Sequence, residues 1–228
     1  LSGSPADILR ADAALWREAG LTERRLKALA QFRAGQDLTV RQEVEEAARL
    51  LDRHRITVLT LADPVYPVLL REIPDPPPLL FCQGETAHLC WPQVAMVGSR
   101  RPSQSGVAAA REFAGELARQ GIGITSGLAV GIDAAAHQAA LQADGITVAV
   151  LGSGLCALYP RAHAALADAI IARDGVLVSE FLPQTGPQQY HFPRRNRVIS
   201  GLGLGVLVVE AAVQSGTLIT ARQALEQN

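Results

Sequence analysis

The chain has 228 residues, of which 48% are hydrophobic, and a formal net charge of −1. This length and apolar content suffice for one large domain, or for a large and a small one. The near-neutral charge excludes a polycation that attracts nucleic acid over its whole surface, so such binding would need a local patch. Because 20 of the 21 basic residues are arginine, nearly every anion contact would use a planar guanidinium that is always charged.

Cysteine content and hydrophobic runs indicate a cytoplasmic protein. The three cysteines are odd in number and form no CxxC motif, so we expect neither a disulfide framework nor a metal site. No apolar run reaches the roughly 18 residues of a transmembrane helix, so no membrane contact is expected. The first 16 residues, LSGSPADILRADAALW, lack the basic region followed by an apolar one that marks a signal peptide.

Residues 1–55 are expected to form a small all-helical domain of two to four short helices. Leucines recur there at helical spacing with charged residues between them, and Gly20 and Gly35 interrupt the pattern. A proline-rich segment, residues 56–93, follows with six prolines between Pro64 and Pro78. Because proline favours extended chain, this segment is predicted to be a linker with extra strands at ITVLTL and LLFCQG.

Residues 94–228 show the alternation of an α/β domain. Short apolar runs, most of which end in glycine or serine, predict strands at 94–98, 122–125, 147–151, 176–180 and 206–210. Stretches of helical pattern separate them, at about 104–120, 132–144, 162–174 and 217–228. Repeated strand, turn and helix indicates a parallel sheet, and the continuously apolar strands indicate helices on both of its faces.

The loops that follow parallel strands share one edge of the sheet, where such folds bind ligands. Three arginine-bearing segments are expected to meet at this edge: Gly98 to Arg100, Arg161, and Arg194 to Arg197. No acidic residue occurs in the windows 86–111 and 181–209, which hold the first and the last of them. Guanidinium groups and glycine turns at helix starts suit phosphate, so we predict an anion site. Tight turns with solvated arginines are the alternative.

Missing motifs narrow the choice of anion. The first strand is not followed by GxGxxG, and a P-loop is excluded because Lys27 is the only lysine, so no nucleotide cofactor is expected. Tyr190 and Phe192 flank His191 just before the arginines, in a chain that is only 4% aromatic. Rings beside cations suit single-stranded nucleic acid, whose bases stack while its phosphates pair. Packing of both rings against the core is the alternative.

Acidic residues at the same edge leave an enzymatic hypothesis open. Asp133 and His137 would share a helix face, but two ligands make a poor metal site. We therefore favour a role for Asp133 in capping or opening the helix, and a local hydrogen bond for His137. Glu180 and Glu210 end two strands and are expected to pair with the arginines. A hydrolase of nucleotides or sugar phosphates, with Glu210 or Asp133 as acid or base, is the alternative function, and a protein-interaction scaffold is a third.

Seven stretches, in order from residue 63 to 226, resemble the DNA-processing protein A family (DprA, also called Smf) of bacterial natural transformation. They are DPVYPVLLREIPDPPPLLFCQGE, VAMVGSRRPSQSG, SGLAVGIDAAAHQAAL, TVAVLGSGLCALYP, SEF, HFPRRNRVISGL and VLVVEAAVQSGTLITARQALE. The resemblance implies an extended Rossmann-like sheet after a SAM-like or helix-hairpin-helix-like domain. It also implies that the protein protects incoming single-stranded DNA, loads RecA onto it, forms a homodimer and has no catalytic activity.

The resemblance also implies roles for single residues. Arg100 matches the arginine of the GSR motif, a phosphate contact, and Arg161 takes the place of a basic residue after the YP dipeptide. Phe192 matches an aromatic residue that wedges between bases, whereas Gln189 stands where members often have lysine, which would weaken one phosphate contact. The residues expected to bind DNA or phosphate are Gly98, Ser99, Arg100, Arg161, Gln189, Phe192, Arg194, Arg195, Asn196, Arg197, Ser215, Gly216 and Thr217.

The chain stops at Asn228 inside a predicted helix. We therefore expect that the last elements of the Rossmann-like sheet lie beyond it, followed in some family members by a winged helix. Because these elements contribute to self-association in the family, the implied homodimer need not form from residues 1–228 alone.

Overall fold

The computed structural model describes residues 10–18, 20–211 and 216–227, which belong to two compact units, Leu1–Arg49 and Leu50–Asn228. The smaller unit contains α2 (Ala13–Glu18), α3 (Glu23–Arg33) and most of α4 (Leu38–His54), so the helices expected in this part of the chain are present. Trp16 and Leu26 are buried within it. The Arg33 guanidinium lies 5.5 Å from the centroid of the Trp16 ring.

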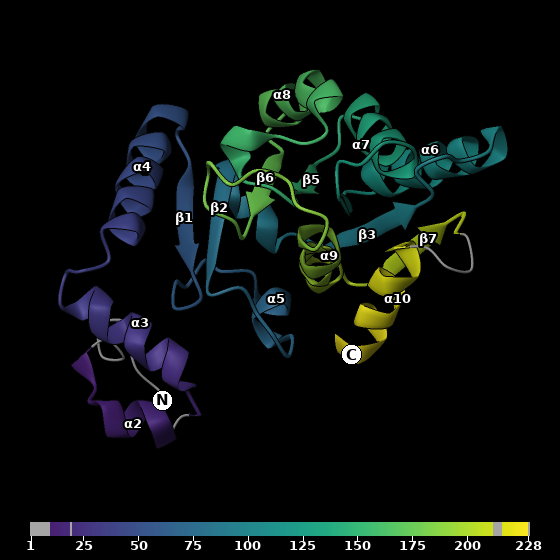
Figure 1. The fold of residues 1–228 in the computed structure, drawn as a ribbon. Helices are drawn as coiled ribbons and strands as arrows, with labels where there is room; N and C mark the ends of the chain where they lie inside the picture. The colour runs from purple at the N-terminus through teal and green to yellow at the C-terminus, as the bar shows by residue number, and fades with distance from the viewer. Residues whose placement is uncertain (1–9, 19, 212–215, 228) are drawn as a thin grey trace. The chain divides into compact units, whose positions relative to one another are not determined.

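The larger unit is built on a seven-stranded sheet with the strand order β1-β2-β6-β5-β4-β3-β7 (Figure 1). The strands are β1 (Thr57–Thr60), β2 (Leu79–Gly84), β3 (Gln93–Gly98), β4 (Gly123–Ser126), β5 (Thr147–Val150), β6 (Val176–Ser179) and β7 (Val206–Val209). The predicted parallel sheet is confirmed for β3 to β7. Residues 56–93, expected to be a linker with extra strands, add β1 and β2 to one edge in antiparallel orientation, so the sheet as a whole is mixed.

Helices cover both faces of this sheet, as predicted (Figure 1). One face carries α6 (Gln104–Arg119), α7 (Ile132–Gln142) and α8 (Ala164–Ala172), and the other carries α5 (Val68–Glu72) and α9 (His191–Leu202), with α10 (Gly216–Gln227) beside α9. Successive strand residues point to opposite faces. Ala95 and Val97 of β3 accordingly pack with the apolar side of α9, whereas Met96 packs with α6 and α7.

Helix α9, like the short helix α5, is an element that the sequence pattern did not reveal. Residues 181–197 were expected to lie in the long segment after a strand, but the helix begins at His191. Val198, Ile199 and Leu202 form its buried apolar side, at the three- and four-residue spacing of a helix. Pro193 is compatible with the first turn because the N–H groups there have no helical partner. The arginine cluster is therefore part of a packed helix.

The arrangement of the sheet creates a crevice at one edge. The chain moves from β3 through β4 and β5 to β6 in one direction, and then returns to place β7 on the other side of β3. Helices α6 and α9 lie on opposite faces of the sheet, and the strand order reverses between β3 and β7, which is where open α/β sheets bind ligands. Among the described helices, none has the length and apolar character to cross a bilayer.

Candidate functional site

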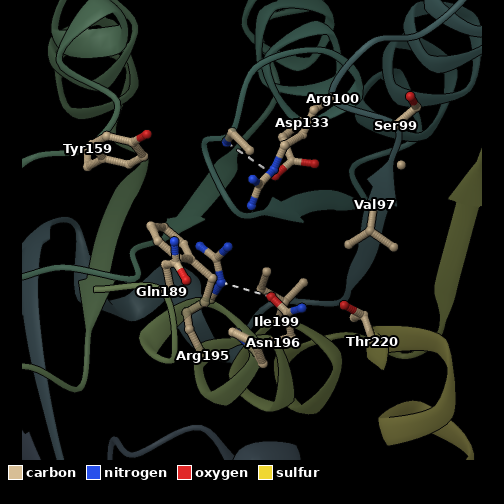
Figure 2. Close-up of a pocket in the computed structure, with 14 residues that line it drawn as sticks. Val97, Ser99, Arg100, Asp133, Tyr159, Gln189, Arg195, Asn196, Ile199 and Thr220 are labelled. Carbon is tan, nitrogen blue, oxygen red and sulfur yellow. Dashed lines mark hydrogen bonds between the residues drawn. The ribbon is translucent and has the colours of Figure 1, made fainter. Parts of the chain in front are cut away.

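A pocket of about 630 Å³ opens at the carboxyl edge of the sheet (Figure 2). The loops after β3, β4, β5 and β6 contribute to its wall, together with the first turns of α9. The sequence-predicted site residues that line it are Gly98, Ser99, Arg100, Gln189, Phe192, Arg195 and Asn196. The pocket thus brings the Arg100 segment and part of the arginine cluster to one place.

Two polar residues that line the pocket were not singled out in the sequence. Tyr159 follows β5 and is exposed, and Thr220 is buried in α10. The YP dipeptide that contains Tyr159 offered a signal for the first. Residue type and spacing offered none for Thr220, because it depends on how α10 packs beside α9.

A cation and two aromatic rings gather at the pocket. The guanidinium of Arg100 lies 5.8 Å from the centroid of the Phe192 ring, within the range of a cation–π contact. The Tyr159 ring lies 5.7 Å from the same ring, and Phe192 is only half-buried. Tyr190 is 63% exposed. Neither Phe192 nor Tyr190 is therefore sealed inside the core.

Arg195 lies in the floor of the pocket and is buried. Its N–H groups donate to the Gly127 carbonyl (2.9 Å), to the Val150 carbonyl and to the side-chain oxygen of Asn196 (3.1 Å). Burial lowers the pKa of Arg195 to about 10, against the opposing effect of the Asp133 carboxylate. The group stays charged at neutral pH, but its hydrogen bonds hold β4, β5 and α9 together.

Asp133 stands in the first turn of α7, where it was predicted to open the helix, but the N-cap of the helix is Gly131 and not Asp133. The Asp133 side chain is buried. One carboxylate oxygen accepts the N–H groups of Gly127 (3.1 Å) and Ala129 (3.2 Å), which fixes the loop after β4. Burial raises the pKa of Asp133, whereas the charge of Arg195 and these N–H groups act to lower it. Asp133 thus fixes this loop, and its interaction with Arg195 opposes the effect of burial on both groups.

His137 lies one turn further along α7 and is fully buried. Its Nδ1 is 2.7 Å from the hydroxyl oxygen of Thr147 on β5, so the predicted local hydrogen bond is confirmed. Burial, followed by the positive charges of His163 and Arg195, lowers the pKa of His137 to about 3. The imidazole is therefore neutral in the folded protein under ordinary conditions.

The neutral state of His137 predicts a stability that depends on pH. In the unfolded chain a histidine titrates near pH 6.5, so between pH 6.5 and about 3 only the unfolded state binds this proton. The free energy of unfolding should fall by roughly 1.4 kcal/mol for each pH unit of acidification inside this window. Urea unfolding of the wild type and of His137→Asn at several pH values measures the difference, and parallel pH profiles would contradict it.

Two arginines of α9, Arg194 and Arg197, form ion pairs with carboxylates that lie outside the helix. The Arg197 guanidinium makes a two-pronged contact with Glu180, at 2.9 Å and 2.8 Å, and also pairs with Asp75 at 3.1 Å. Arg194 lies 3.4 Å from Glu180 but keeps 58% of its side chain exposed. The expected ion pair of Glu180 is therefore confirmed. Neither arginine lines the pocket.

Four other residues were predicted to bind DNA or phosphate, and the structure gives no single outcome for them. Arg161 is exposed at the start of a short 3₁₀ helix, Arg161–His163, and is not among the residues that line the pocket. Gly216 and Thr217 lie in the first turn of α10, and Ser215 lies outside the described residues. The pocket therefore does not join all three predicted arginine segments, because Arg161 is carried by a turn beyond Tyr159.

The prediction for Glu210 was wrong. It was expected to pair with an arginine, but its carboxylate instead accepts the backbone N–H of Ser103 at 2.8 Å and 3.0 Å. The strand β7 ends beside the start of α6, whose unpaired N–H groups attract a carboxylate. The hydrolase alternative needs Glu210 or Asp133 as acid or base, and both carboxylates hold backbone N–H groups here. Within the described chain, no group of three or more metal-ligand side chains occurs.

Comparison with known proteins shows the family to which this chain belongs. Residues 57–228 match the family described as DNA recombination-mediator protein A. The chain belongs to this family. Among its curated relatives, protein Smf of Escherichia coli is 45% identical over 216 residues, which cover 95% of this chain and 56% of the relative. The DNA processing protein DprA of Streptococcus pneumoniae is 42% identical over 185 residues, 81% of this chain and 65% of that protein.

Solved structures of family members share the fold. DprA from Streptococcus pneumoniae has a TM-score of 0.73 at 43% identity, over 79% of this chain and 64% of that chain. DprA from Helicobacter pylori, the subject of a structure on its single-stranded DNA binding mode, has a TM-score of 0.68 at 31% identity, over 76% and 79%. The extended Rossmann-like fold is therefore common to these family members. The chain spans between half and two thirds of the length of the two curated relatives.

Proposed function

We propose that this chain binds single-stranded DNA in the pocket at the carboxyl edge of the sheet, and that it serves DNA processing in natural transformation. The observation that carries the proposal is the Arg100 guanidinium against the Phe192 ring at the pocket. Cations that pair with phosphates next to rings that stack on bases are the usual elements of single-strand binding. The Helicobacter pylori relative, whose structure concerns single-stranded DNA, supports the same ligand.

The pocket residues divide into two roles under this proposal. Arg100 is the exposed lining cation and contacts a phosphate, and Ser99 and Gln189 line the same pocket. The rings of Phe192 and Tyr159 offer faces for a base. Arg195 and Asn196 instead form a buried floor, so they support the pocket and contribute little to phosphate pairing.

A salt titration of DNA binding tests the proposal. Affinity for a single-stranded oligonucleotide should fall steeply as salt rises, because each paired phosphate releases counterions. It should exceed the affinity for a duplex of the same sequence, whose bases are not free to stack. Phe192→Leu should weaken single-strand binding by about fivefold or more, since a stacked base contributes roughly 1–3 kcal/mol. Binding that is equal at low and high salt would contradict the assignment.

We also propose that the chain protects incoming strands and delivers them to RecA, and that the full-length protein acts as a homodimer. The family description as a recombination mediator supports this step. The test is RecA filament growth on single-stranded DNA covered by a single-strand-binding protein. Addition of the chain should shorten the lag of growth, and Arg100→Ala should restore the lag. An unchanged lag with the wild-type chain would argue against delivery.

A further inference from the structure

The loop that carries Arg100 is held at both ends. This loop, residues 99–103, joins β3 to α6 and is called the Arg100 loop below. An exposed arginine on a mobile loop must be ordered when it binds a phosphate, and that ordering costs affinity. A loop that is fixed beforehand avoids part of this cost, so the contacts at its two ends bear on binding.

Glu210 holds the far end of the Arg100 loop. Its two carboxylate oxygens accept the Ser103 backbone N–H at 2.8 Å and 3.0 Å, and one of them also accepts the Ser103 hydroxyl. Ser103 in turn caps α6 by accepting the N–H of Gly106 at 3.0 Å. Glu210 follows β7 directly, and β7 pairs with β3, so a rigid part of the sheet anchors the loop.

Two features show that this contact is built into the fold. The backbone of Glu210 has a φ of 55°, in the left-handed region that non-glycine residues rarely adopt without a compensating interaction. A Cβ atom at position 106 would lie 2.3 Å from a carboxylate oxygen of Glu210. A side chain at position 106 would displace this carboxylate, so the glycine there permits the contact between Glu210 and the start of α6.

A second contact holds the near end of the Arg100 loop. The carbonyl of Ser99 accepts the N–H of Ile132 at the start of α7, at 3.1 Å. Gly131 has a φ of 87°, and a Cβ atom there would lie 2.3 Å from this same carbonyl. The loop is therefore fixed between α7 on one side and Glu210 on the other, and Arg100 projects from between these two contacts.

We propose that Glu210 is a positioning residue for Arg100: by tying Ser103 to the end of β7, it presents the guanidinium to the phosphate of bound single-stranded DNA. The inference rests on the proposed function. The positioning role of Glu210 and its negative charge predict opposite effects on DNA affinity when the carboxylate is removed. Removal of a negative charge from a surface that binds an anion should strengthen binding, whereas loss of positioning should weaken it.

The test compares Glu210→Gln with Glu112→Gln, which removes the same charge from an exposed position on α6. Glu210→Gln should bind a single-stranded oligonucleotide about threefold to tenfold more weakly than this control. The loss should vanish in an Arg100→Ala background, because only a positioned Arg100 is affected. A loss of the same size with and without Arg100, or affinity equal to that of Glu112→Gln, overturns the positioning role.

Hydrogen exchange gives a readout that does not depend on DNA. The amides of Ser103 and Gly106 should exchange faster in Glu210→Gln than in the control, and unchanged exchange overturns the proposal. Ser103→Ala removes the hydroxyl contact with Glu210 together with the cap of α6, but it keeps the backbone N–H contact. It should therefore weaken DNA binding less than Glu210→Gln does, which keeps the test open if Glu210→Gln does not fold. If Arg100→Ala binds DNA like the wild type while exchange is faster in Glu210→Gln, the proposed DNA contact fails and the loop anchor stands.

Discussion

Replacement of Arg195 by methionine is expected to lower the free energy of unfolding of the larger unit by about 3–5 kcal/mol. The change removes the donors to the carbonyls of Gly127 and Val150, and it leaves the buried carboxylate of Asp133 without its compensating cation. Uncompensated buried charge is among the most destabilising changes that a single substitution makes. Urea unfolding of the wild type and the variant, followed by circular dichroism, measures the difference.

A matched control and a second variant isolate the cause of this loss. Arg194→Met makes the same substitution one position earlier, on a side chain that is 58% exposed, and should change stability little. Adding Asp133→Asn to Arg195→Met should recover part of the loss, because the unpaired charge is then gone. A double variant less stable than Arg195→Met would show that the Asp133 charge is not the source of the cost.

Charge reversal at Arg100 is expected to reduce affinity for single-stranded DNA by at least tenfold, for all sequences alike. The guanidinium is the exposed lining cation of the pocket, and a carboxylate in its place would repel a phosphate. Arg100→Ala should lose less affinity and should lower the slope of log affinity against log salt by about 0.7, the value for one phosphate of a single strand. Fluorescence anisotropy at several salt concentrations measures both.

Arg101 provides the control for charge. It is the next residue, it is exposed, and it does not line the pocket. Arg101→Glu makes the same change in net charge, so it should reduce affinity clearly less than Arg100→Glu. Equal losses in the two variants would show that the loop acts through general charge and would remove Arg100 from its specific role.

The arginine cluster shows why charge density in a sequence is a poor guide to contact. Arg194 to Arg197 were expected to bind phosphate or to brace the residues that do. Successive residues of a helix point about 100° apart, so α9 directs these side chains to different places. Arg195 turns into the pocket floor and Arg197 turns to Glu180 and Asp75. Most of the cluster therefore braces the fold, while Arg100, which lies outside the cluster, remains available to a ligand.

Local residue patterns were sufficient for much of this protein. The presence and approximate limits of the strands β3 to β7 followed from short apolar runs, because a buried strand needs apolar residues on both faces. Arg100 could be placed at the binding edge for the same reason, since it directly follows β3 and parallel strands end at one edge.

Other features depended on contacts between residues far apart in the chain. The partner of Glu210, the burial of Arg195 and the place of Thr220 were not visible in any short stretch. A charge is exposed or braced according to what the fold packs against it, and hydrogen bonding of a buried group depends on elements that meet only in the folded chain. The strands β1 and β2 were predicted, but their antiparallel pairing with the sheet was not, because the pattern of a strand specifies its faces and not its neighbours.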